Sequence, residues 1–151
     1  MKIVYTGEEA PKAYKKSIFL AGPTPRNKKV KSWRPEALKI LKMLKCDGVV
    51  FLPEWRNKRK SYHYNYENQV EWEHKHLDSA DIIVFWVPRN LKTLPGFATN
   101  VEFGLYANSG KIVFGAPKTA AKTGYLKFVA DKFFIPRFET LEETLAKALE
   151  I

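Results

Sequence analysis

Short apolar runs alternate along the chain with longer segments of helical periodicity. The runs are rich in Ile, Val and Phe, close on Gly or Pro, and cover residues 17–22, 48–53, 82–87, 111–116 and, more weakly, 133–136. Runs of this length predict strands that are buried on both faces. Between them, helices are predicted over 32–45, 66–80, 100–110 and 124–133, followed by a last helix over 140–150 that begins with a Thr140–Glu143 capping box.

The order of these elements defines the fold class. Their alternation predicts an α/β chain, a flavodoxin-like (Rossmann-like) three-layer sandwich around a mostly parallel five-stranded sheet. The opening segment KIVYT is a candidate for one more strand at the edge. Residues 1–151 are expected to form a single domain. Ligands of such sheets bind at the carboxyl ends of the first and third strands, so the loops 20–26 and 88–100 are expected to surround the site.

Glu102 ends the second of these loops, and two interpretations of it are open. Thr99 and Glu102 have the S/T-x-x-E spacing of a capping box, in which the glutamate bonds back to the start of a helix. A carboxylate at that position is also kept ionised by the helix dipole and is aimed at the ligand cleft, as a nucleophile requires. The residue types alone therefore allow either a cap or a catalytic nucleophile.

Glu73 is a second carboxylate in an unusual place, because it falls on the apolar stripe of the helix predicted over 66–80. An inward carboxylate is costly unless it is hydrogen-bonded. Glu73 either makes a structural bond to backbone near the sheet or lines a pocket and contacts a polar ligand. Two carboxylates beside one cleft are the groups needed to break a bond at an anomeric carbon.

The histidines do not have the spacing of a metal site. His74 and His76 are two residues apart and point in different directions on a helix, and His63 lies outside it. No metal or other cofactor is therefore expected. Trp72 and His76 are four apart and share a face that is expected at a subunit contact.

The net charge of +10 is concentrated in two clusters, residues 26–34 and 55–64. Such clusters are typical either of a solvated face or of a protein that binds phosphate-bearing partners. Sequence-specific recognition of nucleic acid has little support, because no motif for it is present. The single cysteine, Cys46, excludes an internal disulfide and favours a cytoplasmic protein. No membrane association is expected, since no apolar stretch approaches the roughly 20 residues that span a bilayer.

Three segments of the chain, IFLAGPTPR, NQVEWEHKHLDSADIIVFW and TNVEFGLYANSGKIVFGAP, together resemble the nucleoside 2-deoxyribosyltransferase family. The similarity is to its small bacterial and phage branch and covers about residues 15–150. It implies a cytoplasmic enzyme without cofactors that transfers a (deoxy)ribosyl group of a nucleoside or nucleotide between nucleobases through a covalent glycosyl-glutamate intermediate. It also implies a homo-oligomer in which subunits complete one another's sites.

The same resemblance assigns roles to particular residues. Glu102, in the segment Glu102-Phe103-Gly104, is implied to be the catalytic nucleophile. Glu73, eight residues before Asp81, is implied to contact the base and to assist proton transfer, while Asp81 itself is interpreted as structural. The turn that closes over the base corresponds to Ala21, Gly22 and Pro23.

One position departs from the family pattern. Gly96 stands where the transferases carry an acid that holds the sugar hydroxyls, and Thr99 and Asn100 are candidates for that substrate-binding role. Related enzymes of this fold hydrolyse nucleoside monophosphates, so a nucleoside 5′-monophosphate N-glycosidase is the alternative function. Its phosphate would be held by basic residues, the candidates being Lys28, Lys29, Arg34 and Arg56. A non-catalytic nucleotide- or nucleic-acid-binding protein is a third hypothesis, which rests on the basic face.

Overall fold

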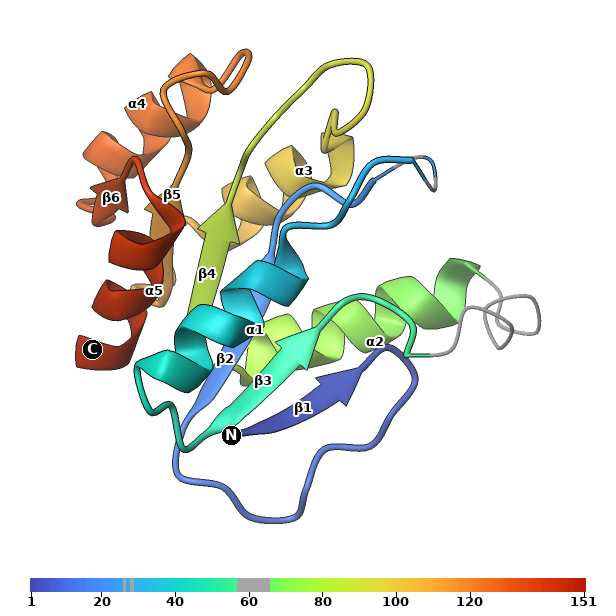
Figure 1. Cartoon of the computed structure of the whole chain (residues 1–151). Coiled ribbons are helices and arrows are strands. Elements are labelled where there is room, and N and C mark those ends of the chain that lie inside the picture. Colours follow the sequence, from blue (N-terminus) through green and yellow to red (C-terminus); the bar gives the residue numbers. More distant parts are fainter. Residues whose placement is uncertain (26, 28, 57–65) are drawn as a thin grey trace.

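After two successive strands, helices and strands alternate to the last helix (Figure 1). The computed structural model describes residues 1–25, 27, 29–56 and 66–151. The strands are β1 (Lys2–Tyr5), β2 (Ser17–Ala21), β3 (Val49–Leu52), β4 (Ile82–Trp86), β5 (Ile112–Gly115) and β6 (Arg137–Phe138). The helices are α1 (Arg34–Met43), α2 (Tyr66–Ser79), α3 (Phe97–Tyr106), α4 (Gly124–Lys132) and α5 (Leu141–Glu150). No helix in the described part of the chain is long and apolar enough to cross a membrane.

The strands form one sheet in the order β1-β3-β2-β4-β5-β6, and every pairing is parallel. Leaving out β1, this is the flavodoxin-like order, which confirms the predicted fold class. The sheet has six strands rather than five because the opening segment forms the edge strand β1, paired with β3 from Lys2 opposite Val49 to Tyr5 opposite Leu52. The chain crosses from β3 over β2 to β4, so the loops after β2 and β4 leave the sheet in opposite directions.

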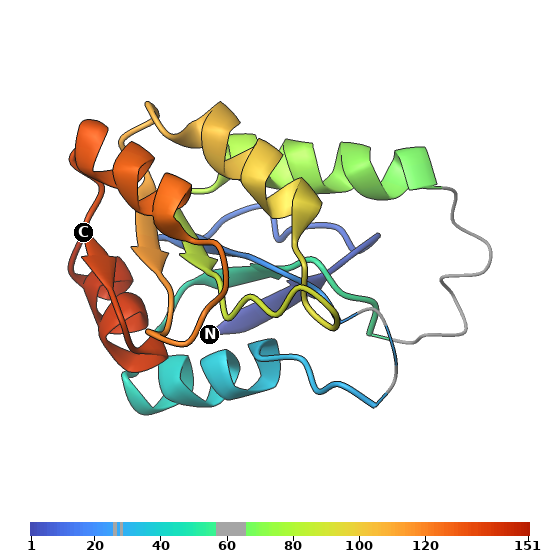
Figure 2. The same cartoon turned by 90° about the horizontal axis from the view of Figure 1, so that it is seen from above.

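Two layers of helices enclose the sheet, with α2, α3 and α4 on one face and α1 and α5 on the other (Figure 2). Side chains of the strands alternate between two cores. Phe19 and Phe85 belong to the core under α2, α3 and α4, whereas Leu20 and Val84 belong to the core under α1 and α5. Because both faces are covered, the strands read in the sequence as continuous apolar runs.

A polar link joins the beginnings of the two central strands. The Asp81 carboxylate accepts hydrogen bonds from the Ser17 backbone N–H, at 2.7 Å, and from the Ser17 hydroxyl, at 2.8 Å. The Asp81 backbone N–H donates in turn to Ser17 Oγ, at 3.1 Å. These bonds lie at the amino end of the sheet and set β2 beside β4, which agrees with the structural interpretation of Asp81.

The strand predicted over 133–136 is wrong. Helix α4 runs to Lys132, and Phe134 then takes a left-handed conformation with φ of 56°. The Ile135 N–H bonds back to the Ala130 carbonyl at 2.8 Å and turns the chain toward the sheet. Residues 133–136 therefore form the turn that ends α4, and the strand β6 begins only at Arg137.

The predicted capping box of the last helix is confirmed. Thr140 is extended, and its Oγ1 accepts the Glu143 backbone N–H at 3.2 Å while its hydroxyl donates to the Glu143 carboxylate at 2.6 Å. A cap of this kind satisfies one of the free N–H groups in the first turn and is worth about 1 kcal/mol.

Candidate active site

A cavity of about 590 Å³ opens at the carboxyl ends of β2 and β4. Its walls come from the turn after β2, the beginning of α1, one side of α2 and the first two turns of α3. The lining residues are Phe19, Ala21, Gly22, Thr24, Arg34, Pro53, Tyr66, Gln69, Val70, Glu73, His74, Pro95, Gly96, Phe97, Ala98, Thr99, Val101 and Glu102. The site therefore lies at the switch point that the order of elements predicted.

The turn after β2 requires glycine at its centre. Gly22 has φ of 142°, and a Cβ atom on it would lie 2.1 Å from the Trp86 carbonyl oxygen at the end of β4. Ala21 and Gly22 line the cavity, as predicted for substrate-binding residues. Pro23 lies beside the cavity, where its ring packs on Gly96 and its carbonyl accepts the Trp33 indole N–H at 3.1 Å.

Helix α3 begins three residues earlier than predicted, at Phe97 rather than Asn100. Gly96 is its N-cap residue, in the left-handed conformation with φ of 63°, and no side chain caps the helix. The capping-box interpretation of Thr99 and Glu102 is therefore wrong, because Glu102 lies in the second turn. The helix dipole is strongest in the first turn and therefore does not keep this carboxylate ionised in the way that the sequence predicted; burial instead raises its pKa.

The surroundings of Gly96 leave no room for the acidic side chain that the transferases carry at this position. A Cβ atom there would lie 2.7 Å from Pro23 Cγ and 3.2 Å from Thr99 Oγ1. Both the backbone conformation and the packing against the β2 turn thus oppose a larger residue. Among the described residues that line the cavity, Glu73 and Glu102 are the only acidic ones.

Both carboxylates have raised pKa values. Burial raises the pKa of Glu102, the negative charge of Glu73 raises it further, and Arg34 lowers it, with a result of about 7. Burial also raises the pKa of Glu73, opposed by a hydrogen bond from Gln69 and by the charges of Arg34 and His74. The Gln69 bond, from Nε2 to Glu73 Oε1, is 2.9 Å long. Glu73 therefore faces the cavity with a side-chain partner rather than a backbone one.

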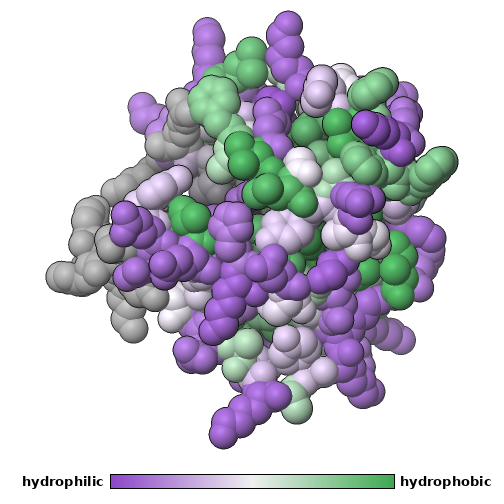
Figure 3. Space-filling model, turned by 180° about the vertical axis from the view of Figure 1, so that it is seen from behind, coloured by the Kyte–Doolittle hydropathy of each residue, from purple (hydrophilic) through white to green (hydrophobic). Residues whose placement is uncertain are grey.

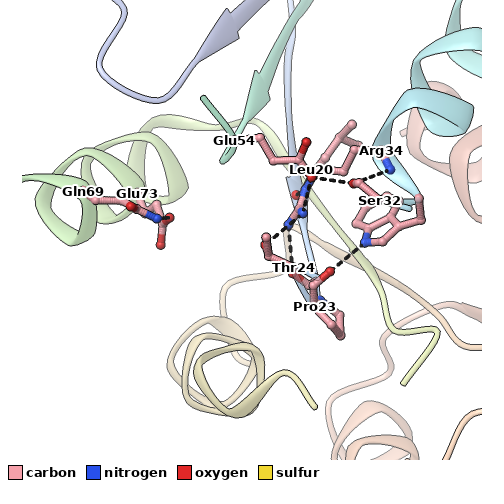
Figure 4. Close-up of polar contacts among 10 residues, drawn as sticks. Leu20, Pro23, Thr24, Ser32, Arg34, Glu54, Gln69 and Glu73 are labelled. Atoms are coloured by element: carbon pink, nitrogen blue, oxygen red, sulfur yellow. Dashed lines mark hydrogen bonds and ion pairs between the residues drawn. The ribbon is translucent and has the colours of Figure 1, made fainter. Parts of the chain in front are cut away.

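Arg34 lies at the base of the cavity, 1% exposed, at the first residue of α1 (Figure 4). Its Nε donates to the Leu20 carbonyl at 3.1 Å and its Nη2 to the Gly22 carbonyl at 2.8 Å. Its Nη1 donates to Thr24 Oγ1 at 3.1 Å and to Glu54 Oε1 at 3.0 Å. Burial lowers the pKa of Arg34, while the charges of Glu54, Glu73 and Glu102 raise it. The guanidinium is thus held by the protein itself.

The other candidates for holding a phosphate lie elsewhere. Arg56 forms an ion pair with Glu8 at 2.6 Å and its guanidinium lies 4.1 Å from the centre of the Tyr5 ring. Lys29 is exposed and does not line the cavity, and Lys28 lies outside the described residues.

Thr99 and Asn100, neighbours on α3, face different surroundings. Thr99 is buried and lines the cavity. Asn100 accepts a hydrogen bond of 2.5 Å from Arg89 Nη2 and lines a separate cavity of about 230 Å³ between α3 and α4. The structure therefore brings Thr99 to the two carboxylates and separates Asn100 from them.

The histidines of α2 also divide between two environments. His76 is buried, stacks on Trp72 at 4.2 Å between ring centres, and has its pKa lowered by burial. The expectation that Trp72 and His76 form a subunit contact is therefore wrong, because both belong to the interior. His74 lines the cavity, and His63 lies outside the described residues. Within the described ranges, no three His, Cys, Asp or Glu side chains gather as a metal site would require.

Sequence reasoning missed Gln69 and His74 as cavity residues. Gln69 precedes Glu73 by four residues, the spacing at which helical side chains meet, so that signal was present. The placement of His74 depends on how α2 rotates on the sheet and had no local signal.

The chain matches the family model described as "Nucleoside 2-deoxyribosyltransferase like" over residues 15–120. This range covers most of the chain and contains the β2 turn, Arg34, Glu73 and Glu102. The protein therefore belongs to the nucleoside 2-deoxyribosyltransferase-like family, and the resemblance noted in its sequence is confirmed. A comparison with curated proteins gave no match.

Proposed function

We propose that the protein is an N-glycosidic-bond enzyme that moves a (deoxy)ribosyl group of a nucleoside or nucleotide from one nucleobase to another. The observation that carries this proposal is the placement of Glu102 and Glu73 in one cavity, where the charge of Glu73 raises the pKa of Glu102. The family membership supports the same reaction class. No cofactor takes part in the proposed reaction.

The reaction proceeds in two displacements at C1′ of the sugar. Ionised Glu102 attacks C1′, the bond from C1′ to the base nitrogen breaks, and its electron pair leaves with the base. The departing base takes a proton from the Glu73 carboxyl, whose pKa is raised by burial. A nitrogen of the second base then attacks C1′, the ester to Glu102 breaks, and Glu73 takes up the proton that the incoming base loses.

Hydrolysis is the alternative outcome of the same intermediate, with water in place of the second base. The proposed phosphate contacts of a 5′-monophosphate glycosidase receive little support from the described residues, because Arg34 and Arg56 are held by partners within the chain. A substrate without a 5′-phosphate is therefore the favoured form of the proposal.

A homo-oligomer is part of the proposal. Helix α3 exposes Phe97, Val101 and Leu105 in one line, with between 63% and 69% of each side chain accessible, and α4 adds Tyr125 and Phe128. Apolar surface gathers on the face of the molecule covered by α2, α3 and α4 (Figure 3). Exposed apolar patches of this kind are typical of protein contacts.

The test is incubation of the protein with deoxynucleosides and deoxynucleotides, with and without an acceptor base. Chromatography would follow free base and exchanged nucleoside, and intact mass would detect a glycosyl adduct on the protein. We expect Glu102→Gln to abolish both products and Glu73→Gln to slow base release. Glu71→Gln, on the exposed side of the same helix, is the matched control and should be unchanged.

Base release that survives Glu102→Gln would refute the mechanism. If no substrate reacts and the protein instead binds DNA with a steep salt dependence that Glu102→Gln does not affect, the nucleic-acid-binding hypothesis would replace it.

A further inference from the structure

Arg34 stands out because a guanidinium is buried at the base of a cavity that also contains two carboxylates. Three of its four hydrogen-bond acceptors, Leu20 O, Gly22 O and Thr24 Oγ1, belong to the end of β2 and the turn that follows. Arginine keeps its charge in proteins, so burial here places a permanent positive charge under the site.

Contacts with several groups fix the position of the Arg34 guanidinium. Glu54 accepts from Nη1 on one side and is itself held by the Ser32 hydroxyl, at 2.5 Å. The Trp33 ring centre lies 4.9 Å from the guanidinium carbon. Backbone carbonyls, an ion pair and a ring thus fix the side chain, and a buried charge that is so fully bonded does not need a ligand to satisfy it.

We propose that Arg34 is a positioning residue of this site, whose fixed guanidinium holds the β2 turn in place and supplies the counter-charge that allows Glu102 and Glu73 to occupy one cavity. This inference deepens the proposed function and rests on those two carboxylates being the reacting groups. Glu54 neutralises Arg34 only in part, because its side chain is 23% exposed and partly solvated.

Titratable and charged groups on three helices lie around Glu102, and two of them shift its pKa. Glu73 on α2 opposes ionisation of Glu102, and Arg34 on α1 favours it. His74 lines the cavity from α2, and Tyr106 on α3 has its pKa raised partly by Glu102. Removal of Arg34 should therefore leave Glu102 with burial and repulsion alone, and its proton should be held to higher pH.

The experiment is a pH titration of the Glu102 side-chain carboxyl followed by carbon NMR, which requires no substrate. In the native protein the midpoint is expected near 7. Arg34→Gln should raise it by about one pH unit, and Glu73→Gln should lower it by about the same amount. Arg34→Lys should restore the midpoint only partly, because an ammonium cannot bond the turn as a planar fork does.

Two variants keep the test decisive. If Arg34→Gln fails to fold, Arg34→Lys, which keeps a positive charge but not the planar contacts to the β2 turn, takes its place, and its Glu102 midpoint should lie above the native one. Arg137→Gln removes one positive charge from the edge strand β6 and should leave the midpoint unchanged.

A Glu102 midpoint that stays in place in Arg34→Gln, or in Arg34→Lys where the glutamine variant does not fold, would overturn the proposal and leave Arg34 a purely structural residue. With an active enzyme, the Arg34→Gln variant should lose kcat more than it raises KM, and its activity should begin at higher pH. If the native protein releases no base while the midpoints move as expected, the proposed function fails and the electrostatic role of Arg34 stands.

Discussion

Replacing Glu102 with glutamine should make the protein more stable at neutral and alkaline pH. Its pKa is about 7 in the folded protein against 4.5 for an ordinary carboxyl. At about 1.4 kcal/mol per pH unit, that difference corresponds to about 3 kcal/mol of unfolding free energy. A carboxyl with a raised pKa binds more protons folded than unfolded between these two values, so the native protein loses this amount as the pH rises through them.

The assay is urea unfolding followed by circular dichroism at about pH 4 and about pH 8. At the lower pH the carboxyl is protonated in both states, so Glu102→Gln and the native protein should unfold alike. At the higher pH the variant should be more stable by about 3 kcal/mol, since it no longer buries a charge beside Glu73. Glu71→Gln, which changes an exposed carboxylate on α2, should leave stability within about 0.5 kcal/mol at either pH.

A loss of stability in Glu102→Gln at both pH values would refute this reasoning, since that is the effect of removing a helix cap. A gain that does not depend on pH would also refute it, because the cause would then be packing rather than charge. The sign of the change thus separates a buried, destabilising carboxylate from a stabilising helix cap without any knowledge of the substrate.

Three other predictions concern activity and stability. Gly96→Ala should lower the unfolding free energy by about 2–4 kcal/mol, because residue 96 has a left-handed backbone and the new Cβ would clash with the β2 turn. Gly104→Ala, whose Cβ would meet no other atom, should raise it by up to about 1 kcal/mol. Equal effects of the two variants in urea unfolding would contradict the backbone conformation assigned to Gly96. Glu73→Gln should move the acid limb of the pH–rate profile, expected near 7, to lower pH, because a repulsive charge on Glu102 is lost, and a limb that moved upward would show that the two do not interact as described. Thr140→Ala should cost about 1 kcal/mol and leave the rate of base release unchanged, and an altered rate would contradict a purely local cap.

Structural features that depend on residues close together in the sequence could be predicted from it. The central strands appear as apolar runs because both faces of the sheet are covered, and the Thr140 cap is complete within four residues. The flavodoxin-like class follows from the alternation of elements, and the loops expected around the site are those that surround the cavity. These signals are local, or they repeat along the chain with the period of the element.

The predictions of local structure that were wrong concern segments where a tertiary contact overrides the local sequence pattern. The Thr99–Glu102 spacing satisfies the capping rule, yet Gly96 begins the helix because its left-handed conformation fits against Pro23, a residue far away in the sequence. The run 133–136 has strand composition, yet it closes α4 because the helix end must turn the chain back to the sheet.

The chemistry of the site was decided in the same way. The identities of Glu73 and Glu102 were evident in the sequence, but burial raises both pKa values, the charge of Glu73 raises that of Glu102 further, and Arg34 lowers both. These three residues stand on three different helices. Desolvation and charge interactions depend on distance in space rather than along the chain. The sequence therefore determined which carboxylates were available, and only the tertiary structure placed them in one cavity above a buried positive charge.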